Sequence, residues 1–163
     1  MQRAMSIFMV CLLVLATTPG FATSGAHFFN DTSATVDLTN GALRIHIDEG
    51  GLGQATTDYT VTGTGSATFQ CFNNGGNHPK AGNKATFGAP ISFSFASNPL
   101  NGRVQETLTA SNTPVANAGF SCPGGQDLYL QSVSYSVTIT DTTNNASAGP
   151  LTTAASSLHL LIP

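Results

Sequence analysis

The sequence predicts an all-β protein built as a sandwich of two antiparallel sheets. Apolar and polar residues alternate with a period of two, most clearly over residues 59–71 and 133–140, and this alternation is typical of strands with one buried face. No window shows the 3.6-residue stripe of an amphipathic helix. Short alternating runs over one domain's length indicate about seven or eight strands in an immunoglobulin-like sandwich, with a closed barrel as the alternative.

The two longest alternating runs are expected to be central strands. From Tyr59 to Cys71 the inward positions carry aromatic and aliphatic residues, but Gly63 and Gly65 also fall on that side. Glycine at an inward position predicts a bend or a bulky neighbour that needs the space.

Shorter runs complete the predicted sandwich. They lie at 34–38, 43–47, 91–96, 104–110, 128–130 and 158–162. The dipeptides Asn40-Gly41 and Asn101-Gly102 separate neighbouring runs, and Asn-Gly in that position is a strong hairpin signal. We therefore expect a hairpin at each dipeptide.

Two irregularities are expected near the C-terminus. The inward positions change from even to odd numbers between Leu130 and Val133, which predicts a bulge or a bend there. Residues 142–157 are rich in Thr, Ser, Ala and Asn, and we expect them to form an exposed connection to the last strand.

The N-terminus has the features of a secretory signal peptide over residues 1–22. Arg3 precedes an apolar run at 5–16, and small residues suit cleavage after Ala22. An uncleaved membrane anchor is the alternative, but the run is well short of the roughly 20 apolar residues that span a bilayer. We therefore predict a secreted, extracellular protein with one domain at 23–163.

Cysteine usage predicts one disulfide bond. Cys11 lies in the signal peptide, which leaves Cys71 and Cys122 in the mature domain. An even pair in a small secreted domain is most simply a disulfide, and two separate buried thiols are the alternative. Closing a loop of about 50 residues stabilises a domain by about 4 kcal/mol in the chain-entropy picture.

Composition excludes several classes of function. Charged residues make up 8% of the chain, the net charge is -3, and Lys and Arg form no basic run, so we expect no binding to nucleic acid. The hydrophobic fraction of 40% predicts a folded core. The motifs of serine hydrolases, zinc proteases and nucleotide-binding proteins are absent from the sequence. We therefore expect no catalytic residue and no cofactor.

The titratable residues form no recognisable metal or catalytic constellation. Four isolated histidines are interpreted mostly as surface residues: His27, His46, His78 and His159. Asp48 and Glu49 precede a glycine-rich segment and are weak candidates for Ca²⁺ ligands, because carboxylates on a flexible loop can bind this ion. Their spacing fits no EF-hand, so a turn with solvated acids is the preferred interpretation.

The segment from Cys71 to Lys84 is rich in Asn and Gly, and we expect a compact loop held by the disulfide against the turn at 122–126. Two interpretations remain open. In the first, the asparagines satisfy backbone groups where strands end. In the second, the loop presents polar donors to a ligand, with Phe72 and Phe120 as an apolar stacking face. The candidate ligand-binding residues are Asn73, Asn77, His78, Lys80, Asn83 and Lys84.

These motifs resemble a group of small secreted microbial proteins of uncharacterised function. The shared patterns are Cys-x-Asn-x-Gly-Gly-x-x-Pro-x-Ala-x-Asn-Lys and Cys-Pro-x-Gly-Gln, followed by Val-x-Tyr-Ser and Asp-Thr-Thr-Asn. In this chain they comprise Cys71, Asn73, Gly75, Gly76, Pro79, Asn83, Lys84, Cys122, Pro123, Gly125, Gln126, Val133, Tyr135, Ser136 and residues 141–144. The match covers residues 51–144 and departs from the pattern at Gly82, where alanine is expected. The resemblance implies an extracellular β-fold with a disulfide and implies no activity.

The sequence as a whole predicts a secreted, non-catalytic, monomeric domain that binds an extracellular glycan or protein. A structural coat or matrix component is one alternative, suggested by Thr-rich outward faces and low charge. A secreted hydrolase using His78 and acids is the other, but six acids cannot be paired from sequence: Asp48, Glu49, Asp58, Glu106, Asp127 and Asp141. The sequons at Asn30 and Asn145 matter only in a eukaryotic host.

Overall fold

The computed structural model describes residues 25–73, 79–110, 113–116 and 119–162, and at 79–82 and 159 it describes the backbone alone. The predicted signal peptide therefore lies outside the described residues. Over the part of the chain that is described, no helix has the length and apolar character needed to cross a membrane.

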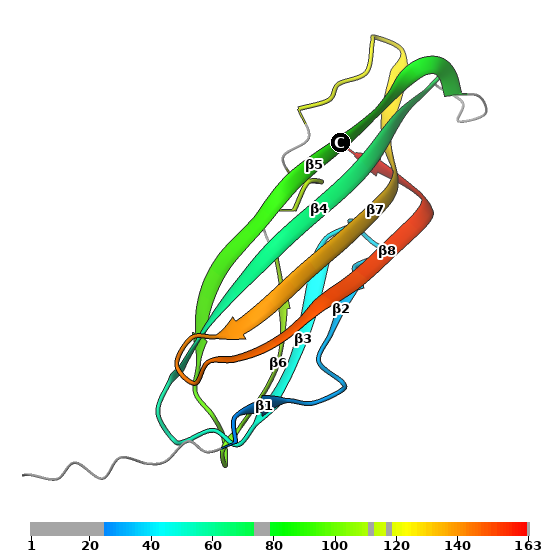
Figure 1. Cartoon of the computed structure of the whole chain (residues 1–163). Coiled ribbons are helices and arrows are strands. Elements are labelled where there is room, and N and C mark those ends of the chain that lie inside the picture. The colour runs from blue at the N-terminus through cyan, green and yellow to red at the C-terminus, as the bar shows by residue number, and fades with distance from the viewer. Residues whose placement is uncertain (1–24, 74–78, 111–112, 117–118, 163) are drawn as a thin grey trace, which may run out of the picture.

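Within the described residues, eight strands form two antiparallel sheets, whose arrangement Figure 1 shows. The strands are β1 (His27–Phe28), β2 (Ser33–Val36), β3 (Leu43–Gly50), β4 (Thr57–Asn73), β5 (Pro79–Ser97), β6 (Arg103–Thr109), β7 (Gln126–Asp141) and β8 (Ala146–Ile162). The large sheet has the order β5-β4-β7-β8. In the small sheet, β3 pairs with β6 along one edge and with β1 and β2 along the other. The predicted all-β sandwich is confirmed.

The core lies between the sheets, where the inward residues of each strand meet. Along β4 the odd-numbered residues face inward, as the alternation predicts. The most buried apolar side chains come from the central strands of both sheets: Leu43, Ile45, Ile47, Tyr59, Val61, Phe69, Leu130, Val137 and Ile139. The predicted central strands are confirmed, because β4 and β7 lie side by side in the middle of the large sheet.

The predicted irregularity after Leu130 is a bulge in β7. The register of β7 shifts against β4 between Thr68 and Phe69, and against β8 between Leu130 and Ser132. Gln131 is the extra residue of β7 at this bulge. Because of it, the even-numbered residues before the bulge and the odd-numbered residues after it both face the core.

The glycines of β4 make room for close packing, as predicted. A Cβ atom at Gly65 would lie 2.8 Å from the Tyr135 ring and 2.8 Å from Cδ of Pro114. The Tyr135 hydroxyl donates a buried hydrogen bond of 2.6 Å to the carbonyl of Gly41, in the turn that joins β2 to β3 of the small sheet. The missing side chain at Gly65 thus allows one tyrosine to connect the two sheets.

The hairpin prediction is confirmed at Asn40-Gly41 and wrong at Asn101-Gly102. Both turns form, and at the second one Leu100 and Arg103 exchange backbone hydrogen bonds of 2.8 and 3.1 Å. However, β5 pairs with β4 and β6 pairs with β3, so this turn carries the chain from the large sheet to the small one. The dipeptide specifies the dihedral angles of the turn, whereas the pairing partners of the flanking strands are set by the whole sheet.

The prediction of an exposed connection at 142–157 is also wrong. Only 142–145 form a turn, and β8 begins at Ala146. The Asp141 carboxylate accepts hydrogen bonds from the backbone N–H of Thr143 and Asn144, at 2.8 and 2.9 Å, which closes the turn tightly. The small residues of β8 then pair with β7. The low sequence complexity of this segment therefore did not indicate an irregular loop.

The predicted disulfide is confirmed, because Cys71 and Cys122 are bonded across 51 residues of sequence. The segment that leads into Cys122 covers the inward face of the large sheet beyond the small sheet. There Phe120 packs on Phe87, with ring centroids 6.0 Å apart. We call this region the disulfide end, and the opposite region, around residues 142–145, the turn end.

We expect Gly65→Ala to lower the free energy of unfolding by about 1–3 kcal/mol, because the added methyl group overlaps Tyr135 and Pro114. Urea denaturation would measure this loss. Gly124→Ala is the matched control, since a Cβ there meets no atom within 4 Å. Equal stability of the two variants would contradict the packing argument.

Replacing both disulfide cysteines by alanine should cost about 4 kcal/mol of stability, because 51 residues of sequence separate them. Thermal melting of the oxidised protein, the reduced protein and the double variant measures the effect. The reduced protein and the variant should melt at similar temperatures, both well below the oxidised protein. An unchanged melting temperature would show that the bond does not restrict the unfolded chain.

Candidate functional site

The outer face of the large sheet is covered by hydroxyl groups. The outward positions of β4 and β7 are almost all Thr or Ser between Asp58 and Gln70 on β4 and between Ser132 and Thr140 on β7. Neighbouring hydroxyls contact one another across the strands, with Thr68 and Thr86 at 3.0 Å and Thr60 and Ser94 at 3.2 Å. Neighbouring strands lie about 4.8 Å apart, so hydroxyl groups recur across the sheet at this spacing. The face is therefore an array of hydrogen-bond donors and acceptors.

The middle of this face is hollowed where its side chains are smallest. The register places Gly88, Ser66, Ser134 and Ala154 in one row across all four strands. The adjoining hollow has a volume of about 680 Å³ and is lined by β4, β7 and β8. We call it the hydroxyl hollow, and its lining residues are Thr64, Gly65, Ser66, Ser134, Tyr135, Ser136, Thr152, Thr153 and Ala154.

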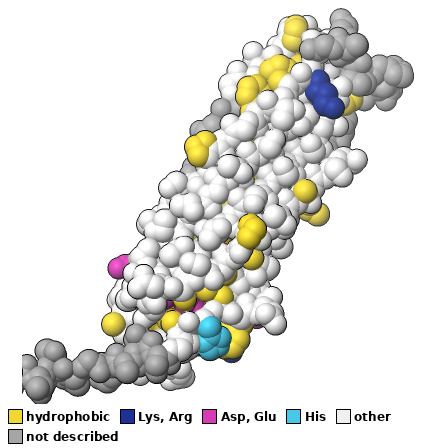
Figure 2. Space-filling view, in the orientation of Figure 1, with side chains coloured by type: hydrophobic (Ala, Val, Ile, Leu, Met, Phe, Trp, Pro, Cys, Tyr) yellow, Lys and Arg dark blue, Asp and Glu magenta, His cyan; other side chains and the backbone are white. Residues whose placement is uncertain are grey.

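Charge is nearly absent from the face around the hollow. Among the outward side chains that are described on the large sheet, the charged ones are Asp58 at the turn end and Lys84 and Asp127 at the disulfide end. Figure 2 shows the same distribution, with charged side chains near the two ends and a broad uncharged surface between them. Between these two ends, a ligand would meet no charged side chain among those that the structure describes.

An aromatic group lies on the same face at the disulfide end. The rings of Phe72 and Tyr129 meet edge to face, with centroids 5.1 Å apart. Tyr129 is paired in register with Leu161, whose side chain is 59% exposed. Phe72 is itself buried, so it is not the apolar stacking face that the sequence suggested, and the apolar surface at this end comes from Tyr129 and Leu161.

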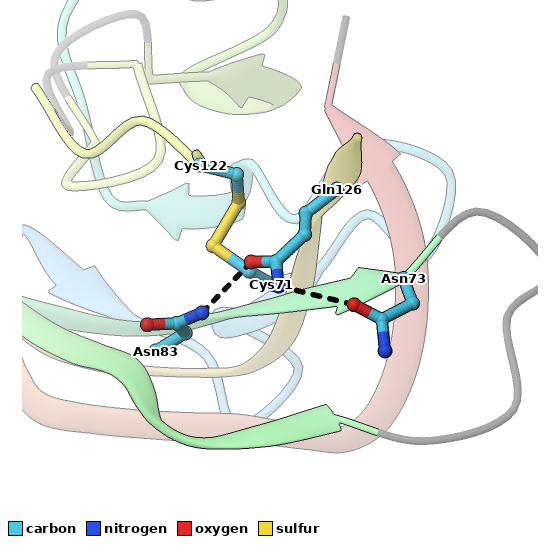
Figure 3. The surroundings of a disulfide bond; sticks show 5 residues. All are labelled: Cys71, Asn73, Asn83, Cys122 and Gln126. Atoms are coloured by element: carbon cyan, nitrogen blue, oxygen red, sulfur yellow. Dashed lines mark hydrogen bonds between the residues drawn. A yellow bond between two sulfur atoms is a disulfide. The ribbon is translucent and has the colours of Figure 1, made fainter. Parts of the chain in front are cut away.

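The predicted loop is mostly strand, because β4 extends to Asn73 and β5 begins at Pro79. Figure 3 shows how Gln126 joins the two strands beside the disulfide. Its side-chain N–H donates to Asn73 at 3.1 Å, and its carbonyl accepts from Asn83 at 2.8 Å. These contacts join side chains, so the two asparagines have partners within the protein, but not the backbone groups that the structural interpretation assigned to them.

The remaining loop candidates are placed only in part. Asn77 and His78 lie outside the described residues, and of Lys80 only the backbone is described. Lys84 is exposed on the outer face of β5. The structure thus brings Asn73 and Asn83 together through Gln126, and it leaves the other candidates as separate groups or untested.

Asp48 and Glu49 are wrongly predicted to lie in a solvated turn, because both belong to β3 and both are fully buried. As neighbours in a strand they face opposite sides of the sheet. Asp48 accepts a hydrogen bond of 2.6 Å from Nε of Arg103, a second one from Nη2 of the same side chain, and one of 2.9 Å from Gln105. The Arg103 hydrogen bonds hold the pKa of Asp48 well below its usual range.

Around Asp48 the acids and a histidine come close together. One oxygen or nitrogen from each of Asp31, His46 and Asp48 lies within 4.8 Å of the others. Nδ1 of His46 also lies 3.2 Å from the Thr107 hydroxyl. Because the Arg103 guanidinium already neutralises Asp48, this cluster has little attraction left for a cation.

Glu49 lies on the inward face of β3, near the turn end. We call Glu49, Tyr59 and Asp141 the acid group. It shares the space between the sheets with Tyr59 and Asp141, which are also almost fully buried. Among the described residues, no hydrogen bond of regular geometry reaches the Glu49 oxygens or the Tyr59 hydroxyl, although the Tyr59 hydroxyl lies beside Glu49 and interacts with its carboxyl group. Burial raises the pKa of Glu49 to about 7, and the negative charge of Asp141 adds to the rise.

Sequence reasoning missed the hydroxyl hollow and the acid group for different reasons. The even-numbered Thr and Ser of β4 were visible as a pattern, but the row that forms the hollow needs the register of four strands. Glu49 and Asp141 are 92 positions apart in sequence, and no local motif connects them.

Replacing Gln126 by Ala should lower the free energy of unfolding by about 1 kcal/mol, because two side-chain hydrogen bonds between β4, β5 and β7 are lost. Gln54→Ala, at an exposed position, is the control. Urea denaturation of both variants measures the difference. If the two variants unfold alike, the bridge contributes no stability.

We expect the stability of the protein to fall as the pH rises from about 5 to about 7. The folded-state pKa of Glu49 lies above its ordinary value, so the protein loses stability as the pH rises through about 7. The slope is limited to about 1.4 kcal/mol per pH unit for one proton. The charged or titratable groups that act on Glu49 are Tyr59, Asp141 and His27.

Denaturation at several pH values in EDTA measures this slope. Glu49→Gln should flatten it, because glutamine does not titrate, whereas Asp127→Asn at an exposed position should leave it unchanged. A slope that persists in Glu49→Gln would contradict the assignment of this titration to Glu49.

The chain was compared with models of protein families, with curated proteins and with solved structures, and none of them matched.

Proposed function

We propose that this protein is a secreted binding domain that holds a neutral polysaccharide on the outer face of its large sheet. The observation that carries the proposal is the hydroxyl hollow, an uncharged and hydroxyl-lined depression across three strands. Tyr129 and Leu161 at the disulfide end supply a further, apolar contact surface on the same face.

The chemistry of the face favours a sugar polymer over other extracellular partners. Each Thr or Ser hydroxyl can donate one hydrogen bond and accept two, which is the same capacity as a sugar hydroxyl. A charged polymer would lose its hydration here without gaining an ion pair. An apolar peptide would leave the hydroxyl array without partners. A neutral, hydroxylated chain avoids both costs.

The predicted extracellular location is consistent with a polysaccharide partner. A disulfide such as Cys71–Cys122 persists in oxidising compartments, and the N-terminal 22 residues have the pattern of a signal peptide. Polysaccharides are abundant outside cells, so a secreted domain would meet them.

A structural role is the second candidate, and the long edge strands favour it. β5 has 19 residues and pairs within the sheet only with β4, so its outer edge offers backbone groups to another copy. In that case the protein would associate with itself rather than with a glycan.

The test is co-sedimentation of the mature, oxidised protein with insoluble cellulose, chitin and β-glucan, with sedimentation velocity in parallel. We expect binding to at least one neutral polymer and a loss of about tenfold or more in Ser134→Glu, which places a charge in the hollow. Thr35→Glu, at an exposed position on the small sheet, should bind as the wild type does.

Equal loss in the two variants would place the binding elsewhere and contradict the proposal. Failure to bind any neutral polymer, combined with concentration-dependent self-association, would overturn it in favour of the structural role.

A further inference from the structure

The open edge of the large sheet carries an inference that does not depend on glycan binding. We propose that two copies of this chain pair through β5, antiparallel and across a two-fold axis, over residues 91–97. The pairing would join two four-stranded sheets into one continuous sheet. This dimer departs from the monomer that we expected from the sequence.

The first step is the regularity of this edge. β5 lies at the border of the large sheet (Figure 1), and among the described residues it pairs only with β4. Its register against β4 runs without a shift from Lys84 to Ser97. A long and regular edge strand is a template for pairing with another chain.

The second step is the direction of the backbone groups at the edge. Asp58 of β4 is paired with Ala96 of β5. The Asp58 N–H donates to the Thr143 hydroxyl at 2.9 Å, and the Asp58 carbonyl accepts from the Thr142 N–H at 2.8 Å, so both groups point away from β5. In an antiparallel ladder the paired residue then points away as well, and this pattern repeats at every second residue. The even-numbered residues of β5, such as Ser94 and Ala96, therefore direct their N–H and C=O groups to the open edge.

Pro90 fits this direction and limits the extent of the pairing. Its position is even-numbered, so its ring nitrogen faces the open edge, where the missing N–H removes no hydrogen bond to β4. A second copy would find no donor at Pro90, and the uninterrupted part of the edge follows it. Residues 85–97 include no charged residue, although charged side chains are a common means of keeping sheet edges apart.

The third step is the match between the faces of two copies. Phe93 and Phe95 lie on the core side of β5 and are only half-buried, whereas Ser94 is exposed on the outer face. With the two-fold axis at Ser94, Phe93 of each copy lies opposite Phe95 of the other. Aromatic pairs across antiparallel strands stabilise a sheet. The same register continues the hydroxyl face from one copy to the next.

The fourth step separates a closed pair from a filament. A filament would place β5 of one copy against β8 of the next copy. β8 is poorly suited to this, because its register against β7 shifts twice and because β1 and β2 of the small sheet lie beside it. Pairing of β5 with β5 uses the same surface on both copies, so it closes at two.

The test is sedimentation equilibrium of the mature, oxidised protein from about 1 μM to about 1 mM. We expect a reversible rise from the mass of one copy to the mass of two, and no further. Ser94→Lys should raise the dissociation constant about tenfold or more, because two lysines would face each other across the axis. Ser147→Lys, at an exposed position on β8, is the matched control and should associate as the wild type does.

Hydrogen exchange gives a readout that needs no variant. The backbone amides of Ser94 and Ala96 should exchange more slowly at high protein concentration than at low concentration, whereas the amide of Gly124 should exchange at the same rate. Exchange at Ser94 and Ala96 that does not depend on concentration would contradict the proposed interface.

A mass that stays at one copy over the whole range would overturn the proposal, and so would equal weakening by Ser94→Lys and Ser147→Lys. Growth beyond two copies would also overturn it and would favour the structural role, in which the assembly stays open. None of these outcomes depends on whether the protein binds a polysaccharide.

Discussion

The pairing of β4 with β7 over the whole length of both strands is the constraint on which the rest of the structure depends. In a pleated sheet this pairing sends alternate residues to opposite faces. One face of the pair therefore collects the core, and the other face collects the hydroxyl array. A shift of one residue would exchange the two sets, and the bulge at Gln131 prevents that exchange where the sequence changes its phase.

The core is closed differently at the two ends of the sandwich. The small sheet covers only part of the large one, so the disulfide end needs another cover for its inward face. The segment that leads to Cys122 provides it, with Phe120 against Phe87 and Gln126 between two asparagines. The turn end is instead closed by a polar group, in which Asp141 both caps the turn and faces Glu49.

Charge is used sparingly in this protein, and each buried acid is informative for that reason. Asp48 has a complete set of partners in Arg103 and Gln105 and acts as a structural ion pair. Glu49, its neighbour in sequence, instead lies between the sheets beside Tyr59 and Asp141, and burial raises its pKa to about 7. The two adjacent residues therefore have opposite electrostatic environments on the two faces of β3.

Local sequence patterns determined the fold class, the central strands, the bulge after Leu130 and the disulfide. Each of these depends on periodicity, on the conformation of a few residues or on cysteine count, which local sequence carries. Tertiary structure alone decided that the turn at Asn101-Gly102 changes sheets, that β8 begins at Ala146, and that Glu49 faces Asp141. These outcomes depend on which strands become neighbours and in what register, and pairing between residues far apart in the chain leaves no local signal.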